Sequence, residues 1–134
     1  RVGTFGVIGL ILYFLGMWIC LRQANWQMVL LFPILGRSAI LVSAGVSTYA
    51  KESGLGKSIV DTAKGLHILL GLSATLLVAV LLDLQLVIPV IAAFIIVFLL
   101  TKRISKILKG ITGDVLGMLV EVSQCVFLLF GVLL

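Results

Sequence analysis

Charged residues are scarce in this sequence. Asp, Glu, Lys and Arg make up 11% of the 134 residues, whereas hydrophobic residues make up 62%. Such a chain has too few polar side chains to cover a water-soluble globule of this size, so lipid must cover the rest. Together with a mean hydropathy of +1.34, this shortage indicates an integral membrane protein.

Cysteine and histidine are also rare. Cys20 and Cys125 lie in separate apolar runs, which excludes the framework of a secreted disulfide domain and a His/Cys metal cluster. The single histidine, His67, stands at the head of a hydrophobic segment, where we interpret it as an interfacial residue without a chemical role. No set of nucleophile, base and orienting residue is visible either.

The alternation of apolar and polar residues that a membrane barrel needs is missing. The run from Leu84 to Leu100 is almost continuously apolar. A chain in lipid must satisfy its backbone hydrogen bonds as a helix or as a closed barrel, and barrel strands alternate. The sequence therefore predicts an all-α fold, a polytopic transmembrane helix bundle.

About five segments are long enough to span a bilayer, which takes roughly 20 apolar residues of helix. The segments are Phe5 to Leu21, Trp26 to Ala50, Leu66 to Leu82, a run up to Leu100, and Thr112 to Leu134. We expect Pro33 to kink the second segment. The short break at residues 83–85 predicts that the third and fourth segments are antiparallel neighbours and form scaffold.

Basic residues are concentrated in two of the connections. Three lysines lie in the loop from Lys51 to Lys64 and four basic residues in the stretch Lys102 to Lys109, whereas the breaks at Arg22 and Asp83 hold one and none. Because positively charged loops stay in the cytoplasm, we expect Arg1 and the 51–65 and 101–112 loops on the cytoplasmic side. The amphipathic stretch 101–109 is expected to lie at the membrane surface near anionic lipid. This asymmetry explains the net charge of +5 without nucleic acid.

Arg37 is the charged residue nearest to the middle of a hydrophobic segment. Burying a charge at a helix centre costs at least about 2.5–3.5 kcal/mol, and such residues are usually functional or paired. At 100° per residue, its face of the helix also carries Leu41, Ala44, Gly45 and Thr48. Arg37 therefore either contributes to a polar site near the cytoplasmic end or pairs with a carboxylate in the membrane.

A second polar group runs from Gly110 to Asp114 and continues with Gly117 and Glu121. Thr112 or Asp114 can cap the start of the fifth segment, where free N–H groups favour an anion. Asp114 and Glu121 lie within about 20° of each other around the helix axis, with Gly117 between them. The two carboxylates could hold magnesium or could pair with Arg37.

The segment Tyr49 to Gly56 is glycine-rich and polar. Its glycines would let backbone amides approach a phosphate, and Lys51 and Lys57 add positive charge. The spacing is neither that of a P-loop nor that of a dinucleotide-binding turn. A plain connecting loop is the alternative interpretation.

In this order, the motifs resemble cobalamin synthase, also called adenosylcobinamide-GDP ribazoletransferase, and correspond to the C-terminal half of that family. Arg1 to Gly6 looks like the family segment that introduces a helix, and Arg37 matches an arginine of the next helix. Tyr49 to Gly56 is similar to a Tyr-Ala-Arg-x-x-Gly-x-Gly pattern. Gly110 to Gly117 is similar to Gly-x-Thr-Gly-Asp-x-Leu-Gly, and Glu121 stands at the acidic position that follows.

Two residues depart from the family pattern. Lys51 stands where an arginine is expected, and it keeps the charge but loses bidentate phosphate geometry. Gln124 stands where a second glutamate is common.

The resemblance implies transfer of the cobinamide phosphate portion of adenosylcobinamide-GDP to α-ribazole, with release of GMP and with Mg²⁺ as cofactor. It implies catalytic roles for Arg37, Asp114 and Glu121. It implies substrate-binding roles for Arg1, Tyr49, Lys51, Gly54, Gly56, Thr112 and Gly113. Asp114 and Glu121 would also be metal ligands, but the main magnesium site is expected in an aspartate-rich motif upstream of Arg1.

The chain begins at Arg1 without an initiator methionine, which favours a piece of a longer protein. Residues 1–134 are thus interpreted as the C-terminal part of one membrane-embedded transferase domain, inactive without the N-terminal half. The resemblance implies a prokaryotic inner-membrane protein with its active-site loops in the cytoplasm. It leaves open whether the protein forms a homo-oligomer.

Two other functions remain open from the sequence. CDP-alcohol phosphatidyltransferases likewise combine membrane helices, aspartates and magnesium, although their aspartate motif is not found in these residues. A transporter subunit could instead use Arg37, Asp114 and Glu121 as an ion relay.

Overall fold

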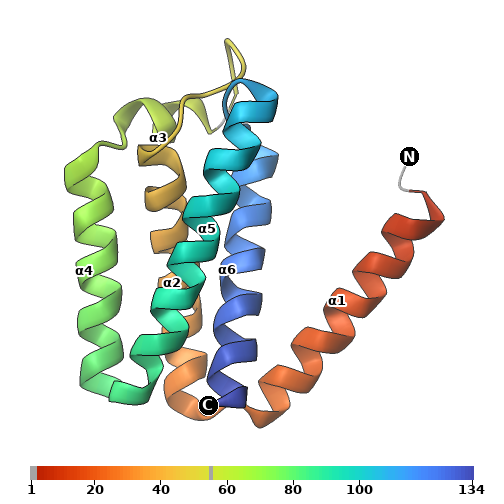
Figure 1. Cartoon of the computed structure of the whole chain (residues 1–134), viewed down its shortest axis with the longest axis vertical. Coiled ribbons are helices and arrows are strands. Elements are labelled where there is room, and N and C mark those ends of the chain that lie inside the picture. Colours follow the sequence, from red (N-terminus) through yellow and green to blue (C-terminus); the bar gives the residue numbers. More distant parts are fainter. Residues whose placement is uncertain (1–2, 55) are drawn as a thin grey trace.

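The computed structural model describes residues 3–54 and 56–134, and its regular structure is helical. Within these residues, five helices are long and apolar enough to cross a membrane, as the sequence predicts. In chain order (Figure 1), the helices are α1 (Thr4–Gln23), α2 (Trp26–Gly45), the short α3 (Lys57–Thr62), α4 (Gly65–Leu82), the 3₁₀ turn η1 (Leu84–Leu86), α5 (Val87–Leu108) and α6 (Gly113–Leu133).

Helix α2 ends earlier than the hydrophobic pattern predicts. It stops at Gly45, not at Ala50, although the residues between them carry no charge. The Ala50 N–H instead donates a hydrogen bond of 2.9 Å to the carbonyl of Ile111, and the Ile111 N–H donates one of 2.8 Å to the carbonyl of Thr48. This pairing with a distant segment replaces the last helical turn.

The fourth span does not end at Leu100, where the sequence predicts its end. Helix α5 runs without a break to Leu108, so Lys102, Arg103 and Lys106 occupy its last two turns. Thr101 is fully buried, and its hydroxyl donates to the Val97 carbonyl at 2.7 Å and lies 3.2 Å from the Ser43 hydroxyl of α2. The helix ends only where Lys109 takes a left-handed conformation with φ 57°.

Helices α2, α4, α5 and α6 form the bundle, with α2 packed against the other three (Figure 1). Side chains such as Leu31, Leu35 and Phe127 are fully buried between them. The Thr75 hydroxyl of α4 donates to the Ser38 hydroxyl of α2 at 2.7 Å. Polar contacts therefore join the helices at points where lipid could not satisfy the hydroxyl groups.

Helix α1 leans away from the bundle (Figure 1). Most of its side chains are exposed, among them Phe5, Leu12 and Trp18. The Tyr13 hydroxyl contacts the Glu121 carboxylate of α6 and so links α1 to the bundle. A polar contact thus holds the helix that has the least buried surface of the five.

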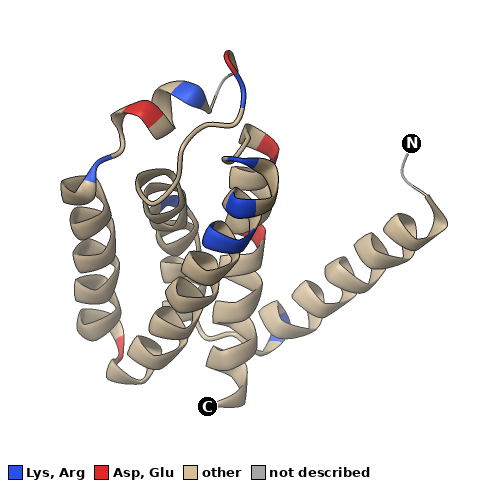
Figure 2. Cartoon of the chain, turned by 45° about the horizontal axis from the view of Figure 1, so that its top comes forward, with Lys and Arg blue, Asp and Glu red and all other residues tan. Residues whose placement is uncertain are grey.

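The charged residues gather at one end of the bundle. Figure 2 shows most of those in the described residues on the loop before α3, on α3, on the last turns of α5 and at the start of α6, and few at the opposite end. The two connections that carry most of the lysines therefore lie at the same end. This agrees with the arrangement expected from the sequence.

Candidate functional site

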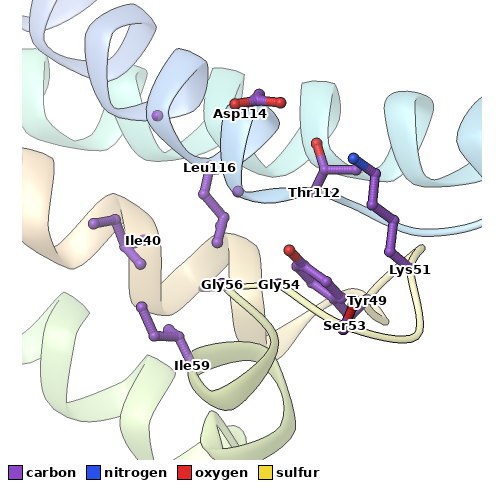
Figure 3. Close-up of a pocket in the computed structure, with 12 residues that line it drawn as sticks. Ile40, Tyr49, Lys51, Ser53, Gly54, Gly56, Ile59, Thr112, Asp114 and Leu116 are labelled. Atoms are coloured by element: carbon purple, nitrogen blue, oxygen red, sulfur yellow. The ribbon is translucent and has the colours of Figure 1, made fainter.

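A pocket of about 480 Å³ lies at the charged end of the bundle (Figure 3). It is formed where the loop after α2 meets α3 and the start of α6. Its lining residues are Ile40, Tyr49, Lys51, Ser53, Gly54, Gly56, Ile59, Thr112, Gly113, Asp114, Leu116 and Gly117. The two glycine-rich motifs, about 60 residues apart in the sequence, therefore share one cavity.

Backbone pairing brings these motifs together. Tyr49 and Ile111 form an isolated parallel bridge through the two hydrogen bonds described above. Gly110 makes the close approach possible, because a β-carbon there would lie 2.8 Å from the Ala50 nitrogen and from the Thr48 carbonyl oxygen. Its φ of +143° is also one that favours glycine. The pocket thus depends on a glycine that does not line it.

The ring of Tyr49 lies in a slot made by glycines. A β-carbon at Gly54 would overlap the Tyr49 hydroxyl and lie 3.1 Å from Cζ, and one at Gly56 would lie 3.2 Å from Cε2. The same position at Gly56 is 3.3 Å from the Cα of Gly113. Gly54 also has φ +152°, a conformation that other residues rarely adopt. These glycines position an aromatic hydroxyl at the wall of the pocket.

The loop between Tyr49 and α3 contributes positive charge. Lys51 lines the pocket, and Figure 3 shows its side chain extending toward the start of α6. The Lys57 ammonium donates instead to the Glu52 carbonyl at 2.8 Å, which closes the loop. Of the two lysines in this motif, Lys51 is the one available to a ligand in the pocket.

The start of α6 provides hydrogen-bond donors. Thr112 is the N-cap, and its hydroxyl accepts from the Val115 N–H at 3.4 Å. The first backbone N–H groups of a helix and the positive end of its dipole favour an anion, and Gly113 leaves them accessible. Asp114 is exposed in the first turn and also lines the pocket. The arrangement combines anion-binding groups with one carboxylate.

Arg37 and Glu121 do not line this pocket. Arg37 lies one turn deeper than the pocket residue Ile40 on α2, and Glu121 lies one turn deeper than Gly117 on α6. The partner of the Glu121 carboxylate is the Tyr13 hydroxyl. Arg1 lies outside the described residues. The structure therefore brings together all of the predicted substrate-binding residues except Arg1, together with Asp114.

The carboxylates do not by themselves make a complete metal site. Within residues 3–54 and 56–134, no three His, Cys, Asp or Glu side chains gather at a position that could hold a metal ion. Asp114 and Glu121 are also about 10 Å apart along the helix axis, at 1.5 Å per residue. One carboxylate together with phosphate oxygens is nevertheless a common magnesium arrangement, and Asp114 beside an anion-binding pocket fits it.

Sequence reasoning missed two groups of residues. Ser53, Ile40 and Ile59 line the pocket, but they carry no pattern that separates them from an ordinary loop or helix. Tyr13 was missed because one tyrosine in an apolar segment is usually interfacial or packed. A hydroxyl in the middle of a hydrophobic segment was the available signal.

The helices define a multi-pass membrane protein with a polar pocket at one end of its bundle. Comparison with known proteins identifies it further: residues 1–132 match the family of cobalamin-5-phosphate synthases (CobS), and the chain belongs to this family. This confirms the resemblance drawn from the motifs.

Curated relatives are named adenosylcobinamide-GDP ribazoletransferase. The relative from Alkaliphilus oremlandii is 33% identical over 136 residues, which cover 100% of this chain and 56% of the relative. The relative from Clostridium acetobutylicum is 33% identical over 139 residues, 96% of this chain and 54% of the relative. The chain thus spans about half the length of the curated relatives it matches. No solved structure shows significant similarity to it.

Proposed function

We propose that the full-length protein transfers the cobinamide phosphate portion of adenosylcobinamide-GDP to α-ribazole and releases GMP. The observation that supports this most directly is the meeting of Lys51, Thr112 and the N-terminus of α6 in one cavity. Such groups suit the two phosphates of a nucleoside-diphosphate-linked donor. Curated relatives are named adenosylcobinamide-GDP ribazoletransferase, which supports this donor and a ribazole acceptor.

In this reaction the hydroxyl of α-ribazole attacks the phosphorus that carries cobinamide. A new P–O bond forms, the bond to the bridging oxygen breaks, GMP leaves with that oxygen, and the hydroxyl proton is lost. Transfer of this kind depends mainly on in-line positioning and on neutralising charge on the phosphate oxygens. Lys51 and the α6 amides would hold those oxygens, and Tyr49 would fix the shape of the loop that carries Lys51.

Magnesium is the cofactor in this proposal. When bound, it would neutralise part of the charge on the diphosphate. Asp114 is the residue of this chain that would help to hold it, with further ligands from the part of the protein outside these residues. Arg37 and Glu121 are exposed one turn below the pocket lining and keep their proposed catalytic roles as charged groups.

The protein is proposed to lie in a prokaryotic inner membrane with the pocket facing the cytoplasm. The lysines around the pocket support this orientation, because basic loops remain on the cytoplasmic side. A phosphorylated substrate would then reach the pocket from the cell interior.

The experiment uses purified full-length protein in liposomes, both substrates and chromatographic measurement of GMP. Release of GMP that chelation abolishes and added Mg²⁺ restores would support the proposal. Residues 1–134 alone are expected to release none. If the full-length protein released no GMP but carried an ion flux that Asp114→Asn abolished, a transporter would be the better interpretation.

A further inference from the structure

Two ionisable side chains lie at membrane depth on the surface of the described chain. Arg37 is eight residues before Gly45, the end of α2, and Glu121 is eight residues after Gly113, the start of α6. At 1.5 Å per residue, each is about 12 Å below the pocket end of its helix. Both are exposed. Lipid is an unfavourable neighbour for them, because a charge at such depth costs at least about 2.5 kcal/mol.

The two side chains lie on the same side of the α2 and α6 pair. A β-carbon at Gly36 would lie 3.0 Å from Val120 and 3.1 Å from the Gln124 carboxamide carbon, so the helices meet there. Arg37 is the residue after Gly36, and Glu121 is the residue after Val120. Each side chain is therefore rotated by about 100° around its helix axis from the point where the helices meet. Because α2 and α6 are antiparallel (Figure 1), these rotations carry both side chains to one side.

The same side holds a groove between α1 and α6. The groove has a volume of about 360 Å³ and is lined by Leu10, Tyr13, Met118, Glu121, Val122, Cys125 and Val126. The contact between Tyr13 and Glu121 holds the carboxylate in this groove. Apart from the Tyr13 hydroxyl and the Glu121 carboxylate, which contact each other, the lining is apolar, as packing of a further membrane helix requires.

We propose that a transmembrane segment of the same protein, from the part outside residues 1–134, packs in the α1–α6 groove and extends over Arg37. The length of chain that remains supports this occupant. The Alkaliphilus oremlandii relative has 44% of its length (100 − 56) outside the match. This is roughly 100 residues, enough for several spans of about 20 residues each.

The proposed transmembrane segment would also border the pocket. A segment that covers Arg37 and Glu121 lies one turn below Ile40 and Gly117, which line the pocket. It would therefore complete the wall of the pocket on its deeper side. Membrane depth, exposure and chain length support this packing whatever reaction the protein catalyses.

The test is photo-crosslinking in the full-length protein in its native membrane, without substrate. A diazirine-bearing amino acid replaces Val122 in the groove, with Met118 as a second groove position. Leu81 on α4, which is 75% exposed, is the matched control. After illumination, mass spectrometry identifies what each position has joined.

Both groove positions are expected to join peptides of the same chain from outside residues 1–134, while Leu81 joins lipid. Lipid adducts alone at both groove positions would overturn the inference. Crosslinked dimers through the groove would also overturn it, because they assign the groove to a second copy. No substrate is present, so a failure here is distinguishable from a failure of the proposed reaction.

Discussion

The Tyr49 side chain occupies the space that a β-carbon at Gly54 would need. Such an atom would overlap the Tyr49 hydroxyl and lie 3.1 Å from its Cζ. The tyrosine and the glycine are five residues apart, so the loop folds back on its own first side chain. The backbone next to Lys51 takes its shape from this contact, and so does one wall of the pocket.

Replacing Gly54 with alanine is therefore expected to disturb the loop. The alanine would meet the Tyr49 ring and would have to adopt φ +152°, which costs on the order of 1–3 kcal/mol. We expect at least about a tenfold loss of GMP release by the full-length protein, since tenfold corresponds to about 1.4 kcal/mol. Gly65→Ala is the matched control, because a β-carbon at Gly65 meets nothing within 4 Å. Equal activity of the two variants would contradict this role of Gly54.

Gly110→Ala is expected to separate the two motifs. Its β-carbon would approach the backbone of Thr48 and Ala50 to 2.8 Å, so the bridge between Tyr49 and Ile111 would have to open. Two hydrogen bonds at about 0.5–1.5 kcal/mol each would be lost or weakened. Thermal unfolding in detergent should show a lower Tm together with reduced GMP release. A variant with wild-type values for both would show that the bridge is dispensable.

Gly117 offers a test of the pocket volume. A β-carbon at Gly117 meets nothing within 4 Å, and the residue lines the pocket. Gly117→Ala should therefore keep nearly normal kinetics, whereas Gly117→Leu should raise KM for adenosylcobinamide-GDP by about tenfold or more, at the cost of about 1.4 kcal/mol of binding. The Tm of both variants is the control for folding. If Gly117→Leu folded normally with unchanged KM, the substrate would have to bind elsewhere.

The buried contact between Thr75 and Ser38 is expected to matter little for activity. Hydrogen bonds between membrane helices contribute about 0.6 kcal/mol on average, and this pair lies outside the pocket lining. Thr75→Val should lower Tm slightly and leave GMP release within about twofold of wild type, since twofold is less than 1 kcal/mol. A tenfold loss of GMP release without a change in Tm would give the pair a role in the reaction.

The five spans could be predicted from the sequence because long apolar runs have few alternatives in a bilayer. Thr112 at the start of α6 was also predictable, since the capping preference is local. The ends of α2 and α5 were not. Helix α2 ends at Gly45 because the residues that follow pair with Ile111, a residue far along the chain. Helix α5 continues because the Thr101 hydroxyl is hydrogen-bonded within the bundle. The hydropathy pattern predicts neither of these helix ends.

The site could be predicted in part for the same reason. Tyr49, Gly54 and Gly113 belong to motifs that are compact in sequence, and the structure joins them in one cavity. The partner of the Glu121 carboxylate is instead Tyr13, a residue 108 positions earlier. A contact at that separation leaves no local pattern from which it could be recognised.

The most direct test of the central claim, that the pocket binds the diphosphate, compares two lysines of the connection between α2 and α4, one before α3 and one after it. Lys51 lines the pocket, and Lys64 does not. A lost hydrogen bond to a charged group costs about 1.5–3 kcal/mol, so Lys51→Gln should raise KM for adenosylcobinamide-GDP at least about tenfold. Lys64→Gln should leave KM unchanged. Equal KM values for the two variants in correctly folded full-length protein would contradict the account.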